Sequence, residues 1–139
     1  MNIYFACSIT GGRAFEPLYQ AMVAALVSDG HQVPTAHLAE IGAGEKEAVL
    51  RPHEVYMRDV GWIRASDVLI AEVSVPSHGV GYEIGFALGL GKPVLALYEQ
   101  DRKVSKMLSG NPDANLQVKA YRDAQEGIQI MREFLARSY

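Results

Sequence analysis

Apolar residues fall into short continuous runs that alternate with longer segments in which they recur every three or four positions. The short runs are typical of buried strands, and the longer spacing is typical of helices packed on a sheet. The expected strands are Ile3–Cys7, His31–Thr35, Val68–Val73, Pro93–Tyr98 and Leu116–Tyr121. The expected helices are Ala14–Leu26 with Gly30 as its stop, Pro52–Ala65, Val80–Leu90, a short helix from a cap at Asp101 to Leu108, and Ala124–Arg137.

This alternation predicts an α/β fold with a parallel sheet covered by helices on both faces. Five strands with this spacing suggest a flavodoxin-like, doubly wound sheet in the order 2-1-3-4-5. Pro34 makes the second strand weak and suggests an edge position. The polar segment between Ala39 and Arg51 is either a mobile loop over a site or a solvated connection.

Length and composition indicate one domain spanning residues 1–139 of an ordinary globular protein, with 49% hydrophobic and 21% charged residues. A net charge of −3 argues against a general nucleic-acid binder. Cys7 is the single cysteine, which excludes an intrachain disulfide framework and fits a reducing compartment. No apolar run is long enough to span a membrane and no charged leader precedes the first strand, so we expect a cytoplasmic protein.

The segment Ser77–Gly85 follows the central apolar strand and opens the next helix. Gly79 and Gly81 let the backbone turn tightly and approach a ligand. Glu83 is expected in the first helical turn, where the helix dipole favours an ionised carboxylate that can act as nucleophile or base. The alternative is a glutamate that only stabilises the helix. The spacing G-x-G-x-x-x-G does not match the dinucleotide fingerprint, so we reject a Rossmann cofactor site.

A second Gly-containing turn, from Ser8 to Arg13, follows the first strand and precedes a helix. Backbone N–H groups at such a helix start suit a phosphate, although Gly11 and Gly12 are equally explained by a tight turn. In the expected topology, ligands bind beyond the carboxyl ends of the strands at the switch point. Ser8, Gly11, Gly12, Ser77 and Glu83 should therefore line one cleft.

Asp59 lies on the apolar side of its expected helix, together with Tyr56 and Ile63. A carboxylate there must be paired or used, and a salt bridge to Arg58 or Arg64 is the structural alternative. The four histidines form no metal-binding pair, so we expect no metal.

Four segments together resemble the nucleoside 2-deoxyribosyltransferase family, and most of all its hydrolytic branch, the 2′-deoxynucleoside 5′-monophosphate N-glycosidases. The resembling segments are Tyr4–Arg13, Arg58–Ile63, Ala65–Val73 and Gly79–Gly85. They cover most of the chain in the family's order, which is more specific than any single motif.

The resemblance implies that Glu83 attacks the anomeric carbon and forms a glycosyl intermediate that water resolves. It implies that Asp59 holds the sugar and helps to protonate the departing base, and that Tyr4 orients the nucleophile. The substrate-binding residues that it implies are Ser8, Gly11, Gly12, Arg13, Ser77, Gly79, Gly81 and Ser105. Ser105 would reach over from a second subunit, so a homodimer is implied, and no cofactor is needed.

Thr10 departs from the hydrolytic branch, which usually has arginine there. Either Arg13 compensates for the missing arginine, or the affinity for phosphate is weaker. The departure keeps two alternatives open: base transfer between deoxynucleosides, and a non-catalytic module that only binds a nucleotide. The preferred base and the selectivity between deoxyribose and ribose are not apparent from the sequence.

Overall fold

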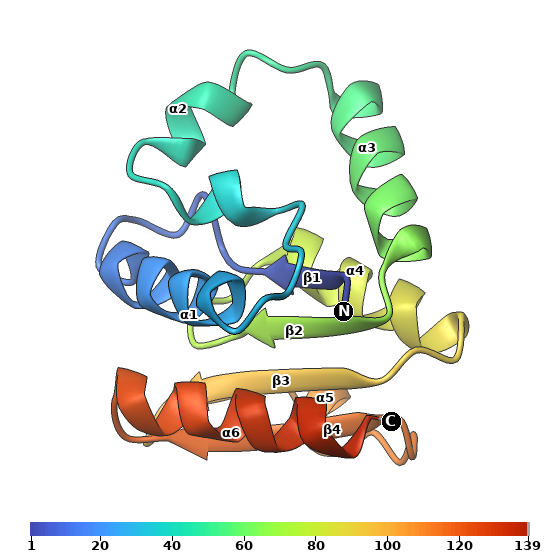
Figure 1. Cartoon of the computed structure of the whole chain (residues 1–139). Coiled ribbons are helices and arrows are strands. Elements are labelled where there is room, and N and C mark those ends of the chain that lie inside the picture. Colours follow the sequence, from blue (N-terminus) through green and yellow to red (C-terminus); the bar gives the residue numbers. More distant parts are fainter. Residues whose placement is uncertain (139) are drawn as a thin grey trace.

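The computed structural model describes residues 1–138 and places a parallel sheet between two layers of helices (Figure 1). Four strands lie in the order β1-β2-β3-β4, which are Ile3–Ala6, Val68–Glu72, Val94–Glu99 and Leu116–Tyr121. The helices are α1 Glu16–Ser28, the 3₁₀ helix η1 Ala36–Ala39, α2 Ala43–Glu47, α3 Pro52–Ala65, α4 His78–Gly89, α5 Lys106–Ser109 and α6 Ala124–Arg137.

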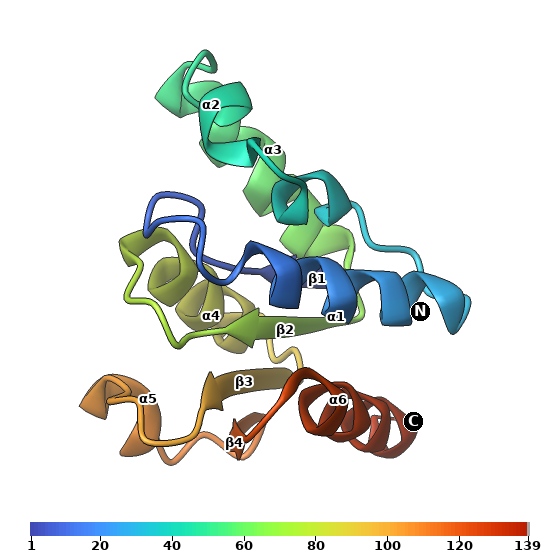
Figure 2. The same ribbon diagram turned by 90° about the vertical axis from the view of Figure 1, so that its left-hand side faces the viewer.

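Alternating side chains of the strands divide the core between the two faces of the sheet. Ile3 and Phe5 of β1 face the cluster formed with α1 and α6. Tyr4 and Ala6 face the opposite cluster, which is formed with α3 and α4. Figure 2 shows α1 and α6 on one side of the sheet and α4 and α5 on the other. The expected α/β class is therefore confirmed.

The expected number of five strands is wrong, because residues 31–35 contribute only one bridge, between Asn2 and Gln32. Pro34 has no N–H to donate, and the chain turns away there through a bond from the Ala36 N–H to the Val33 carbonyl. The Phe5 N–H on this edge of β1 donates instead to Thr35 Oγ1, at 3.0 Å. A side chain thus replaces the missing strand partner.

Three helix starts also differ from the expectation, and the first is only a shift of α1 from Ala14 to Glu16. The helix of the central motif begins at His78 because Ser77 Oγ caps it by accepting the Val80 N–H. Glu83 therefore lies beyond the first turn, and the expected support from the helix N-terminus does not apply. Ser105, rather than Asp101, caps α5. Among residues 1–138, no helix is long and apolar enough to cross a membrane.

Candidate active site

Tyr4 and Glu83 meet on the face of the sheet that α3 and α4 cover. The Tyr4 side chain is fully buried, and its hydroxyl donates to Glu83 Oε1 at 2.7 Å. The residues come from β1 and α4, which are 79 positions apart. The bond fixes one carboxylate oxygen of Glu83 and leaves the other available to a ligand.

The environment of Glu83 favours its neutral form. Burial raises the pKa of Glu83 to about 7, and the negative charge of Asp59 adds to this, whereas the Tyr4 hydrogen bond and the charge of Arg58 act in the opposite direction. Burial, with the nearby charges of Glu83 and Asp59, also raises the pKa of Tyr4. Glu83 therefore titrates near neutral pH, as expected of a group that exchanges roles during a reaction.

Asp59 lies on α3 close enough for its charge to act on Glu83, and it is also ion-paired. Arg58 Nε donates to Asp59 Oδ1 at 2.8 Å. The structural alternative from the sequence, a salt bridge to Arg58, is thus present. It does not remove Asp59 from the site, because Glu83, Tyr4 and Asp59 still act on one another electrostatically.

The turn after β1 holds a buried hydroxyl without a partner. Ser8 is 4% exposed, and among the described residues its Oγ is the one buried side-chain polar atom with no hydrogen bond. A Cβ on Gly11 would lie 2.7 Å from Ser8 Oγ and 2.2 Å from Val75 Cγ1. Only glycine fits this contact, and it brings the turn against the loop after β2 that leads to Ser77.

The later residues of this turn, from Thr10 to Arg13, are exposed. Gly12 has a φ of 100°, a left-handed conformation that favours glycine. Arg13 Nη2 is 2.7 Å from Glu45 Oε1, and Arg13 Nε is 3.9 Å from Glu16. The cation that could replace the missing arginine at Thr10 is therefore already paired with two carboxylates.

Ser105 lies on a different side of α4 from Glu83. It is exposed, and its Oγ accepts the Met107 N–H at 3.2 Å as the cap of α5. A cavity of about 590 Å³ separates α4 from α5, and Ser77, Gly81, Lys103 and Ser105 are among the residues that line it. Glu83, Tyr4 and Asp59 do not line this cavity, so one chain does not bring Ser105 to the carboxylates. Gly79, also in the first turn of α4, is exposed.

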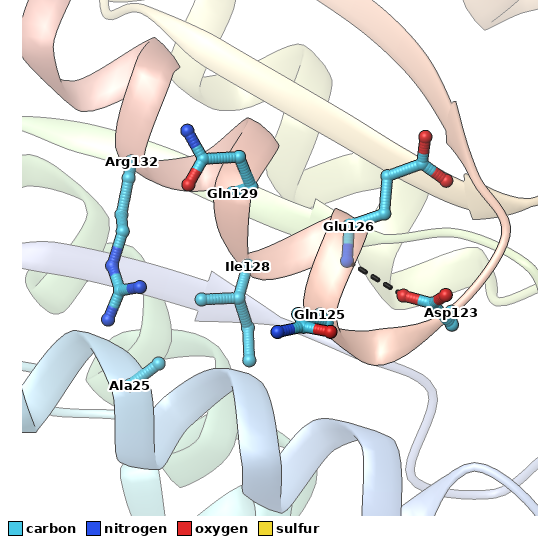
Figure 3. A pocket seen from close by; sticks show the side chains of 7 residues that line it. All are labelled: Ala25, Asp123, Gln125, Glu126, Ile128, Gln129 and Arg132. Carbon is cyan, nitrogen blue, oxygen red and sulfur yellow. Dashed lines mark hydrogen bonds between the residues drawn. The ribbon is translucent and has the colours of Figure 1, made fainter.

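Another cavity, of about 580 Å³, lies between α1 and α6 (Figure 3). Its charged groups are already engaged: Asp123 accepts the Glu126 N–H, and Arg132 pairs with Asp29. None of the residues expected to act on a substrate lines it. Within residues 1–138 there is also no cluster of His, Cys, Asp or Glu that could hold a metal.

The sequence places Glu72 at the end of the central strand, where it either orients a polar group in the cleft or is paired structurally, whereas nothing in the sequence singles out Glu47. Glu72 is fully buried at the end of β2, where Oε1 accepts the hydroxyls of Ser74 and Tyr121, the latter at 2.8 Å. Glu47 of α2 accepts a bidentate pair of bonds from Arg58, at 2.9 and 3.0 Å. The position of Glu72 at the end of an apolar run marks it in the sequence. No pattern in the sequence indicates that Glu47 contacts Arg58.

Comparison with known proteins identifies the class. The family model for nucleoside 2-deoxyribosyltransferases matches residues 3–131, so the chain belongs to that family, which confirms the resemblance found in the sequence. A Methanosarcina barkeri protein named "Putative 2′-deoxynucleoside 5′-phosphate N-hydrolase 1" is 43% identical over 134 residues, covering 96% of this chain and 84% of that protein. The 5-hydroxymethyl-dUMP N-hydrolase of Mus musculus is 39% identical over 140 residues, covering 97% and 80%.

Two solved structures share the fold. The CMP N-glycosidase BcmB of Clostridium botulinum has a TM-score of 0.72 at 20% identity, covering 95% of this chain and 98% of that one. The solution structure of BlsM has a TM-score of 0.76 at 24% identity, covering 98% and 92%. At these identities the likeness concerns the fold alone.

Proposed function

We propose that the protein hydrolyses the N-glycosidic bond of 2′-deoxynucleoside 5′-monophosphates, giving a free base and 2-deoxyribose 5-phosphate. The observation that carries the proposal is the Tyr4–Glu83 hydrogen bond beside Asp59, which holds a partly buried carboxyl with a pKa of about 7. Relatives named as nucleotide N-hydrolases match nearly the whole chain at about 40% identity, which supports the same substrate class.

In the proposed reaction the Glu83 carboxylate attacks C1′ as the bond to the base breaks, and the bonding electrons leave with the base. The positive charge that develops on the sugar is stabilised by the carboxylates. Asp59 holds the sugar and helps to protonate the departing base. Water then attacks C1′, its proton passes to the Asp59 carboxylate, and the bond to Glu83 breaks, so the anomeric configuration is retained.

Ser8, the backbone of Gly11 and Gly12, and Ser77 form the proposed cradle for the 5′-phosphate. The unpartnered Ser8 hydroxyl supports this, because a buried polar group without a bond is costly unless a ligand or water satisfies it. Gly79, Gly81 and Arg13 are proposed to line the same site. Arg13 would have to exchange its contact with Glu45 for the substrate.

We propose further that two chains form the working enzyme, with Ser105 of one completing the site of the other. The proposal is supported by the position of Ser105 in its own chain, where it lines a cavity that the carboxylates do not line. A homodimer would let this exposed hydroxyl, which caps α5 in its own chain, also reach a substrate in the other. A cytoplasmic location stays a prediction.

The test is a panel of 2′-deoxynucleoside monophosphates with the matching nucleosides, assayed for free base and for sugar product. The expected result is base release from the monophosphates and none from Glu83→Ala, whose fold is checked by circular dichroism. If no substrate releases base, the proposal is wrong, and tight nucleotide binding without turnover would favour the non-catalytic module.

One observation favours a second candidate, base transfer between nucleosides. Thr10 removes a cation from the phosphate turn, and Arg13 is occupied by Glu45. Supplying a deoxynucleoside with a second free base separates the two reactions, because a new nucleoside without net hydrolysis is the product of transfer.

A further inference from the structure

The side chain of Arg58, on α3, joins two carboxylates that come from α3 itself and from α2. Its Nε donates to Asp59 Oδ1 at 2.8 Å, and its two terminal nitrogens donate to the two oxygens of Glu47 at 2.9 and 3.0 Å. One guanidinium therefore spans two carboxylates, one from α3 and one from the end of α2. Bidentate pairing of this kind restricts geometry as well as adding energy.

This group is shielded from solvent and held from the side. The side chains of Arg58, Glu47 and Asp59 are 22%, 14% and 14% exposed. The guanidinium also lies 4.9 Å from the centre of the Trp62 ring, one helical turn further along α3. His37 is a further titratable neighbour, with Nε2 3.4 Å from Glu47 Oε1, and the charge of Arg58 also acts on Glu83 and Tyr4. Surface ion pairs are loosely held, whereas this arrangement is fixed on several sides.

The same contact attaches α2 to the rest of the protein. This five-residue helix has Ala43 as its single buried residue. Its other ion pairs with arginine or lysine, from Arg13 to Glu45 and from Lys46 to Glu40, join side chains that are more than half exposed. Figure 1 shows α2 and α3 beyond the β1 edge of the sheet, connected by a loop. The Arg58–Glu47 pair is thus the shielded link across that loop.

We propose that Arg58 is a positioning residue for the proposed N-glycosidase reaction, and that Glu47 acts with it. Arg58 holds Oδ1 of Asp59 and turns Oδ2, which has no hydrogen-bond partner among the described residues, toward the substrate. Because Glu47 holds the other side of the guanidinium, the orientation of Asp59 depends on α2 being seated. This inference rests on the proposed function and adds to it a residue that touches neither substrate nor Glu83.

A purely structural salt bridge would affect stability alone, so the test must measure the pH dependence and the kinetic constants of the reaction. The positive charge of Arg58 acts on Glu83 as well as on Asp59, and it opposes the increase in the pKa of Glu83. Removing it should move the pH at which the nucleophile ionises, and loosening Asp59 should lower kcat more than it changes KM.

The experiment compares wild type, Arg58→Gln, Arg58→Lys and Glu47→Gln for base release from a monophosphate between about pH 5 and 9. Arg64→Gln, at an exposed site on the same helix, is the matched control. Arg58→Gln should lower kcat on the order of tenfold to a hundredfold and move the acid limb of the profile to higher pH. Arg58→Lys should keep the limb in place with only partial kcat, since lysine keeps the charge and loses the bidentate geometry. Glu47→Gln should lower kcat less, without moving the limb.

Amide hydrogen exchange over residues 43–47 reports the seating of α2 independently of activity. It should be faster in Glu47→Gln and Arg58→Gln than in wild type and Arg64→Gln. The inference is overturned if the wild type is active and Arg58→Gln has the same kcat and the same acid limb as Arg64→Gln. If amide exchange over residues 43–47 is unchanged in the variants, the claim that this ion pair seats α2 is wrong. If Arg58→Gln does not fold, full kcat in Arg58→Lys is the overturning result. A wild type that releases no base defeats the proposed function instead.

Discussion

Glu83→Gln should make the protein more stable at neutral pH while abolishing its proposed activity. The substitution keeps the shape of the side chain, and its amide oxygen can still accept the Tyr4 hydroxyl, but the buried charge is gone. Because burial raises the pKa of Glu83 from an ordinary 4.5 to about 7, the folded state binds this proton more tightly than the unfolded state. Folding of the wild type is therefore linked to protonation.

The sign and size follow from these two values. Below about pH 4.5 the carboxyl is neutral in both states, and its titration does not change the free energy of unfolding. Between 4.5 and about 7 the unfolded state loses the proton first, so wild-type stability falls as pH rises, and above 7 the cost is constant. Each pKa unit corresponds to about 1.4 kcal/mol, so the full cost reaches about 3 kcal/mol. Glutamine avoids it.

Thermal unfolding of wild type and Glu83→Gln from about pH 5 to 8 measures this difference. The gap in Tm should favour the variant and widen with pH, at roughly 3–5 °C per kcal/mol for a chain of this length. Glu133→Gln, at an exposed position of α6, controls for the removal of a carboxylate and should show no such trend. A gap that stays constant across this range, or a more stable wild type at pH 8, would refute the reasoning.

Three further substitutions test other contacts. Tyr4→Phe removes the bond that lowers the pKa of Glu83, so the acid limb of base release should move to higher pH and kcat should fall about tenfold; an unmoved limb in a pH–rate profile would contradict this. Gly11→Ala places a methyl group against the loop after β2, and KM should rise more for a monophosphate than for its nucleoside, as steady-state kinetics on both will show. Tyr121→Phe leaves Glu72 with one hydroxyl donor fewer, and urea unfolding should show a loss of about 1–2 kcal/mol in the free energy of unfolding.

Much of the fold could be predicted from the sequence because burial imposes simple patterns. The strands between residues 68 and 121 are apolar runs with few polar interruptions, and all three occur where those runs predict them. Residues 31–35 give a weaker strand signal, because only Val33 and Pro34 among them are apolar. They fail to form a strand because Pro34 lacks a donor and Thr35 offers its side chain to β1, a contact 30 positions away that no local pattern encodes.

In the candidate site, too, the residues could be predicted from local patterns, but the contacts between distant segments could not. Tyr4, Asp59 and Glu83 could be chosen from motifs, since each lies in a segment that resembles the family. The electrostatic state of Glu83 could not. Counting from the wrong helix start put it in a position favouring the charge, whereas burial beside Asp59 favours the neutral form. The contact of Arg58 with Glu47 depends on how the loop between α2 and α3 folds back, and sequence spacing says nothing of that.

The Thr35 hydroxyl bound to the Phe5 amide has a consequence for self-association. An open strand edge is a template on which a second molecule can add a strand and begin to aggregate. Here the outer edge of β1 has donors already satisfied by Gln32 and Thr35, so an incoming chain finds few free groups. On the opposite edge, β4 carries the exposed charge of Lys119, which discourages such pairing. Both edges of the four-stranded sheet thus disfavour the addition of another strand, one through satisfied donors and the other through charge.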